Sequence, residues 1–266
     1  MRAGPSSSYY DDTPAAAERY EALHRDQRDD VAFYVGEARR AGGPVLEVGC
    51  GTARVALAVA EAGIPAVGID RSPHMLAVAR ARCLAADPGA RERLRLVRAD
   101  MRAFSFRRPF ARVVLPFRVL QSLVEVEDQL AALARCREAL APEGRLVFNV
   151  FDPRYDLLAA GLAPLELTET GRTYRDGGGV EVREKWTGWY EPVRQLLHGT
   201  FIYERTEGDS VERVFEPLEL RYFFRYEIEH LLARAGYQIE ELFGGWDRQP
   251  YREHGQEMVF IARKAT

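Results

Sequence analysis

Cysteine is scarce in this chain, which has three cysteines, Cys50, Cys83 and Cys136, among 266 residues. They lie far apart in a spacing that fits neither a disulfide framework nor a metal site, so we expect free thiols in a reduced, cytoplasmic protein. No apolar run approaches the roughly 18 residues that a membrane-spanning helix needs. Residues 1–8 lack the apolar core of a signal peptide, which also favours a cytoplasmic location.

The sequence also has no excess of positively charged residues. The sequence holds 37 Lys and Arg against 40 Asp and Glu, a net charge of -3. Binding to nucleic acid depends on a basic surface, so we expect no nucleic-acid partner. Five histidines occupy no recognised catalytic or ligand spacing. We therefore assign no catalytic base and expect no bound metal.

What the chain does contain is a strand, a glycine turn and a helix near its start. An apolar strand, 45–48, precedes Gly49 and Gly51, which permit a sharp turn and the close approach of a ligand to the backbone. A second buried strand, 65–69, ends at Asp70. That acid lies about 20 residues beyond the turn, from where a carboxylate reaches ribose hydroxyls in nucleotide-binding units. The stretch predicts a site for an adenosine-containing cofactor.

Strands and helices alternate over most of the chain. We expect helices at 14–24, 29–41, 55–60, 73–86, 128–140 and 225–235, and strands at 45–48, 65–69, 94–97, 110–115, 145–151, 237–243 and 257–262. This order predicts an α/β fold, a Rossmann-like, doubly wound, mostly parallel seven-stranded sheet with a closing antiparallel hairpin.

The pattern changes after residue 152. Aromatic and valine-rich runs at 180–186, 195–205 and 211–220 alternate with period two and are separated by turns, which is typical of an antiparallel sheet. We therefore expect three parts: a helical cover (1–42), a cofactor-binding domain (43–152 and 223–266), and an inserted antiparallel β lid that serves the substrate (153–222).

Two cofactor classes compete for the glycine turn. A dinucleotide fingerprint needs a third glycine where this chain has Arg54, whose bulk disfavours that class. Glu47 before the turn, Asp70, and Asp100-Met101 after the third strand are additional features. With Glu47-Val48-Gly49-Cys50-Gly51-Thr52-Ala53 as its first motif, the chain resembles class I S-adenosylmethionine-dependent methyltransferases. In detail it is similar to sugar N-methyltransferases and to glycine or sarcosine methyltransferases.

The resemblance implies roles for particular residues. The methionine ammonium would be organised by Glu47, and the ribose hydroxyls would be bound by Asp70, since a carboxylate can accept two hydrogen bonds. The full set of expected cofactor contacts is Tyr20, Glu47, Gly49, Cys50, Gly51, Asp70, Arg71, Met75, Asp100, Met101, Leu115 and Pro116. A second tyrosine that could cover the cofactor is Tyr10.

The expected substrate contacts lie after the fourth strand and in the insertion: Arg118, Gln121, Trp186, Tyr222, Phe224 and Arg225. The predicted function is transfer of a methyl group from S-adenosyl-L-methionine to nitrogen or oxygen of a small molecule, by in-line displacement. Two alternatives remain open, a nicotinamide-dependent oxidoreductase and a non-catalytic cofactor-binding protein of the same fold. Homodimer formation is also open.

Overall fold

The computed structural model describes residues 13–27, 29–159, 164–252 and 257–265. Tyr10 lies outside these residues. Contacts divide the chain into two compact units, one made of residues 27–153 and 223–266, the other of residues 1–26 and 154–222. The sequence grouped the first two expected helices together, whereas this division separates them.

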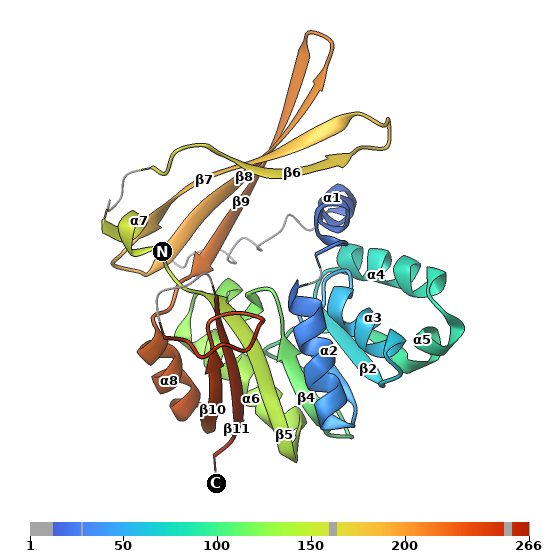
Figure 1. Ribbon diagram of the computed structural model, residues 1–266, viewed down its shortest axis with the longest axis vertical. Coiled ribbons are helices and arrows are strands. Elements are labelled where there is room, and N and C mark those ends of the chain that lie inside the picture. The colour runs from blue at the N-terminus through green and yellow to red at the C-terminus, as the bar shows by residue number, and fades with distance from the viewer. Residues whose placement is uncertain (1–12, 28, 160–163, 253–256, 266) are drawn as a thin grey trace. The chain divides into compact units, whose positions relative to one another are not determined.

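The larger unit is built on a seven-stranded sheet in the order β10-β11-β5-β4-β1-β2-β3 (Figure 1). Its strands are β1 (Val45–Val48), β2 (Ala66–Asp70), β3 (Leu94–Arg98), β4 (Phe110–Leu115), β5 (Leu140–Phe151), β10 (Tyr237–Phe243) and β11 (Glu257–Lys264). Neighbours are parallel except for β11, which is antiparallel to both β5 and β10. The expected doubly wound, mostly parallel fold is confirmed.

Helices cover both faces of this sheet. One apolar cluster joins the sheet to α2 (Asp29–Ala41), α3 (Arg54–Glu61) and α5 (Pro88–Arg93). A second cluster, on the other face, joins it to η1 (Val119–Ser122), α6 (Val126–Ala139) and α8 (Arg225–Arg234). A further helix, α4 (Pro73–Ala85), has Ser72 as its N-cap, whose hydroxyl accepts the Met75 N–H, and proline in its first turn. Burial on both faces explains why central strands such as β2 are mostly apolar, whereas the edge strands β3 and β10 also carry exposed polar residues.

The start of β5 differs from the expectation of a turn at 142–144. In the structure the strand begins at Leu140, opposite Phe110, and the pairing then shifts so that Arg112 faces Arg145. The intervening residues form an irregularity within the strand, so the turn signal of Pro142 and Gly144 marks a bulge rather than a break. The sequence also did not predict α5 or η1, which are too short to show a helical period.

The smaller unit contains a four-stranded antiparallel sheet, β6 (Thr168–Arg175), β7 (Glu181–Glu191), β8 (Leu196–Glu207) and β9 (Ser210–Arg221), in that order (Figure 1). Two helices belong to the same unit, α1 (Pro14–His24) and α7 (Tyr155–Ala159). Arg19 of α1 lies over the ring of Tyr203 and donates to the buried Glu216 carboxylate at 2.8 Å, which fastens α1 to the sheet. The inserted antiparallel sheet is confirmed, with β6 as an unpredicted edge strand.

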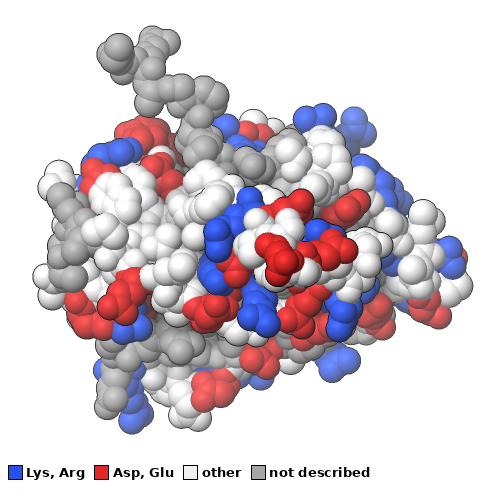
Figure 2. All heavy atoms as spheres, turned by 90° about the horizontal axis from the view of Figure 1, so that it is seen from above, with Lys and Arg blue, Asp and Glu red and all other residues white. Residues whose placement is uncertain are grey.

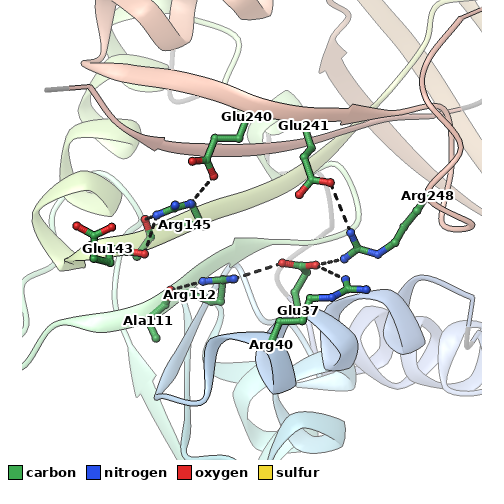
Figure 3. Close-up of polar contacts among 10 residues, drawn as sticks. Glu37, Arg40, Ala111, Arg112, Glu143, Arg145, Glu240, Glu241 and Arg248 are labelled. Carbon is green, nitrogen blue, oxygen red and sulfur yellow. Dashed lines mark hydrogen bonds and ion pairs between the residues drawn. The ribbon is translucent and has the colours of Figure 1, made fainter.

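A buried carboxylate ties α2 to the rest of the larger unit. Glu37 is 2% exposed and meets three guanidinium groups, those of Arg40 (2.8 Å), Arg112 (3.4 Å) and Arg248 (Figure 3). The three come from α2, from β4 and from the segment after β10. Arg248 also lies over the rings of Phe33 and Phe243. Burying a charge is tolerated only when it is paired, and Glu37 is paired by three different elements.

Candidate cofactor-binding site

The glycine turn follows β1 at the carboxyl edge of the parallel strands. Gly49 (φ 70°) and Gly51 (φ 52°) adopt left-handed conformations that disfavour residues with a side chain. An added Cβ at Gly49 would also lie 2.7 Å from a methyl carbon of Val119 in η1. The Cys50 amide donates to the Ile69 carbonyl at 2.9 Å, which holds the turn against β2. The turn is therefore held in place, and Gly49 and Gly51 are partly exposed, so a ligand can approach their backbone.

Asp70 lies at the end of β2, beside this turn. Its Oδ2 accepts the Gly51 N–H at 2.8 Å and its Oδ1 accepts the Ser72 N–H at 2.9 Å. Burial raises the pKa of Asp70, while these two backbone donors act in the opposite direction. A carboxylate has about four acceptor positions, so two ribose hydroxyls can be accommodated in addition to the amides. The geometry fits the nucleoside role expected for Asp70.

Glu47 lies in the middle of β1 and is 3% exposed. Its Oε2 accepts the Ala56 N–H at 2.6 Å. The N-cap of α3 is Ala53 (φ 58°), which offers no side-chain acceptor, so Glu47 supplies from a neighbouring strand the hydrogen bond that an N-cap residue normally supplies. Burial raises the pKa of Glu47 to about 8. Its expected contact with the methionine ammonium stays a prediction.

Arg54 opens α3 and is 4% exposed. Its guanidinium donates to both Asp30 oxygens, at 2.5 and 2.6 Å, and to the Gln27 carbonyl at 2.9 Å. The arginine that disfavoured a dinucleotide is therefore a buried anchor between α2 and α3. Two-pronged pairing of this kind fits the planar geometry of arginine. Sequence reasoning missed Asp30, because its contact with Arg54 spans 24 residues and the sequence carries no local signal for it.

The residues expected to contact adenine differ in whether other side chains already pair with them or pack against them. The Asp100 carboxylate accepts from Arg102 at 2.7 and 3.0 Å, and this pairing holds the pKa of Asp100 below its usual value. Arg71 is exposed at the end of β2. Met75 is 6% exposed, and Met101 packs against the core. The proposed adenine contacts of these residues stay predictions.

The segment after β4 combines buried and strained residues. Leu115 and Pro116 are buried, while Phe117 (φ 57°) and Arg118 (φ 65°) both adopt left-handed backbone conformations. Two consecutive residues of this kind outside glycine are uncommon and are often found near functional sites. Arg118 pairs with Glu257 and lies over the Phe151 ring.

Gln121, in η1, is fully buried, and its Oε1 accepts the Phe151 N–H at 2.8 Å. The last pair between β4 and β5 is Leu115 with Phe148, so the end of β5 extends beyond β4. The hydrogen bond between Gln121 and Phe151 supports this extension. Both Gln121 and Arg118 are thus engaged by the protein, and their substrate contacts stay predictions.

Trp186 lies beside the cross-strand pair Gly188 and Gly199, since an added Cβ at either glycine would lie 3.0–3.1 Å from its indole. Tyr222 is 2% exposed and packs edge-on against Tyr190. Both aromatic side chains therefore pack against residues of the smaller unit. The Tyr20 ring of α1 lies 4.6 Å from the His24 ring of the same helix, tilted by 44°.

Phe224 and Arg225 lie at the start of α8. The Phe224 N–H donates to the Glu227 carboxylate at 2.7 Å, and the exposed Arg225 pairs with Glu229 at 2.8 Å. Both therefore have roles in starting or stabilising the helix. Their substrate contacts, like those expected of Trp186 and Tyr222 and the cofactor contact of Tyr20, stay predictions.

Within the described ranges, no cluster of three or more His, Cys, Asp or Glu side chains could hold a metal ion. Among the same residues, no helix is long and apolar enough to cross a membrane. Cys50 and Cys136 are buried, and burial raises the pKa of both thiols.

Comparisons with known proteins agree with this geometry. Residues 45–144 match the family model described as "Methyltransferase domain". The chain is 26% identical over 261 residues to the dTDP-3-amino-3,6-dideoxy-alpha-D-glucopyranose N,N-dimethyltransferase of Streptomyces fradiae, covering 91% of this chain and 90% of that protein.

Two solved structures show the same fold. The CcbJ methyltransferase of Streptomyces caelestis superposes with a TM-score of 0.75 at 22% identity, covering 90% of this chain and 96% of that chain. The amino pentose methyltransferase CalS10 of Micromonospora echinaspora, solved with S-adenosylmethionine bound, gives a TM-score of 0.67 at 23% identity, covering 94% and 96%.

Proposed function

We propose that this chain, an S-adenosylmethionine-dependent methyltransferase that carries the methyltransferase domain, methylates an amino nitrogen of a small sugar-like molecule. The observation that carries the cofactor part is the glycine turn locked to Asp70, inside the segment that matches the family model. The acceptor part is supported by the similarity, over most of both chains, to a protein of Streptomyces fradiae named as an amino-sugar N,N-dimethyltransferase.

When bound, S-adenosylmethionine supplies a methyl group on a positively charged sulfur. Asp70 would hold the ribose hydroxyls, and Gly49 and Gly51 would let the backbone lie against the ligand. Glu47, with its proton released, would face the methionine ammonium. Because the methyl group is already activated, the remaining task of the protein is to hold the acceptor atom close and in line and to exclude water.

Other acceptor classes receive less support. Figure 2 shows basic and acidic side chains interspersed over the face in view, without a basic patch of the kind that nucleic-acid binding needs. We also propose a cytoplasmic location, supported by free rather than disulfide-bonded cysteines. Homodimer formation stays a prediction.

The experiment is methyl transfer to the sugar nucleotide of the Streptomyces fradiae relative. The protein would be incubated with S-adenosylmethionine and that 3-amino sugar nucleotide, and mass spectrometry would follow the product. We expect a gain of one or two methyl groups on nitrogen. The matched control is the nucleotide with a hydroxyl in place of the amine, which should not react. Methylation of the hydroxyl compound alone, or none in a panel of amino sugars despite cofactor binding, would contradict the proposal.

A further inference from the structure

Another acid lies at the carboxyl edge of the large sheet, at the end of β5. Asp152 directly follows the strand and is 4% exposed. Its Oδ2 accepts a hydrogen bond from the Tyr251 hydroxyl at 2.8 Å. By the sheet order, β2 and β5 are separated by β1 and β4, so Asp70 and Asp152 lie about three strand spacings, roughly 14 Å, apart across the sheet.

The register places Asp152 further out along the strand direction than the glycine turn. Phe148 pairs with Leu115, and Glu47 pairs with Val114, so the turn begins at about the level of Asn149. Asp152 lies three residues beyond that level, about 10 Å further along. A ligand that fills the turn and Asp70 thus leaves Asp152 on the side of β4 and β5. The resemblance implies that the methionine end of the cofactor lies at Leu115 and Pro116, where β4 ends, so this is the side where an acceptor would meet it.

The Tyr251 hydroxyl is held by a well-braced segment. The Tyr251 N–H donates to the Leu242 carbonyl at 3.1 Å, and the Gly244 N–H donates to the Gln249 carbonyl at 2.9 Å. Between them, Arg248 is paired with Glu37 and Glu241 (Figure 3). A binding group that is supported in this way keeps its orientation, so no reorganisation energy is needed at the moment of reaction.

We propose that Asp152, oriented by Tyr251, binds the amino group of the acceptor, an inference that rests on the proposed function. A protonated acceptor amine first releases a proton to solvent. The nitrogen lone pair then forms the new N–C bond, and the C–S bond breaks with its electron pair on sulfur. Positive charge therefore passes from sulfur to nitrogen. A carboxylate beside the nitrogen favours that shift, and most strongly where water is excluded. The methylated ammonium then releases its proton to solvent.

This arrangement would also discriminate between acceptors. A protonated amine gains more than a neutral hydroxyl from a buried carboxylate, because the attraction between two opposite charges adds to the hydrogen bond. Asp152 thus favours amines over alcohols of the same shape. A purely structural Asp152 would only fasten the segment that carries Tyr251 to β5.

The test measures binding rather than turnover. In the presence of S-adenosylhomocysteine, calorimetry would compare the 3-amino sugar nucleotide with its 3-hydroxy counterpart, for the wild type and for Asp152→Asn. We expect the wild type to prefer the amine by about ten-fold or more, and Asp152→Asn to lose that preference with unchanged affinity for S-adenosylhomocysteine. Asparagine retains an acceptor for the Tyr251 hydroxyl, so the segment keeps its anchor. Tyr251→Phe should weaken the preference, and Asp247→Asn, exposed in the same segment, should leave it intact.

The outcomes are distinct. A preference for the amine that survives in Asp152→Asn, or no preference in the wild type, would overturn the assignment of Asp152. Loss of thermal stability without a change in the preference would do the same, because it would show a structural role. Failure of the wild type to methylate the amine, with the binding preference present and dependent on Asp152, would instead count against the proposed function alone.

Discussion

Replacement of Glu47 by glutamine tests whether burial of this carboxyl group makes the stability of the protein depend on pH. Glu47→Gln keeps the shape of the side chain and an oxygen that can accept the Ala56 N–H, and replaces the ionisable carboxyl group with a neutral amide. Burial raises the pKa of Glu47 from 4.5 to about 8. In the unfolded chain the group ionises near its ordinary pKa. Between these two values, therefore, the folded protein holds a proton that the unfolded chain has lost.

The sign of the effect follows directly. The raised pKa contributes stability that is fully present below about pH 4.5 and is lost as the pH rises through about 8. Each pKa unit corresponds to about 1.4 kcal/mol, so the wild type should lose up to about 5 kcal/mol relative to Glu47→Gln across this window. This is a large part of the roughly 5–15 kcal/mol of stability typical of a folded protein.

Denaturant unfolding at several pH values measures this difference. The variant and the wild type should be similar near pH 5 and should diverge steadily up to about pH 8, with the variant more stable. Subtracting the two curves cancels the other titrating groups. Parallel curves over the whole range would refute the reasoning. Cofactor binding adds a second readout: if Glu47 faces the methionine ammonium, binding at pH 7 should release a proton in the wild type but not in Glu47→Gln.

Two further predictions follow from the buried contacts of the site. Asp30→Ala leaves the Arg54 guanidinium without its carboxylate and should destabilise the protein by about 3–5 kcal/mol in denaturant unfolding. The double variant, Asp30→Ala with Arg54→Met, should recover much of that loss. An unchanged unfolding midpoint for Asp30→Ala would contradict this prediction. Gly49→Ala should abolish cofactor binding in calorimetry, because the added Cβ meets Val119. Gly63 also has a left-handed backbone but has open space around it, so Gly63→Ala should only lower the melting temperature. Equal cofactor binding by both variants would contradict the steric argument.

Much of the architecture could be predicted from local pattern. Most strands of the large sheet are rich in apolar residues and have glycine or proline near one end, and their alternation with helices indicates a parallel sheet. The position of Asp70 at the end of β2, beside the glycine turn, could be predicted because its distance from the turn reflects one strand–helix–strand unit. The short α5, η1 and α7 were missed because five or six residues, or fewer, show no helical period.

The rest of the site depends on contacts between distant residues. Asp30 meets Arg54 across 24 positions, and Tyr251 meets Asp152 across 99, and neither pair has a local signature. Arg118 was expected to be available for a substrate, yet Glu257, 139 residues away, engages it. Side-chain pairing of this kind is set by the packing of the whole sheet, so a single sequence gives the positions of charged residues but not their partners.

The most direct test of the cofactor site is a calorimetric titration with S-adenosylhomocysteine. Wild type and Asp70→Asn would be compared, with Asp87→Asn as the control, since Asp87 is a helix N-cap outside the site. If Asp70 binds both ribose hydroxyls, losing its charge should cost about 2–3 kcal/mol and weaken binding by roughly 30- to 150-fold, while Asp87→Asn should bind normally. Equal affinity of Asp70→Asn and the wild type, or no binding by the wild type, would contradict the assignment of this edge of the sheet as the S-adenosylmethionine site.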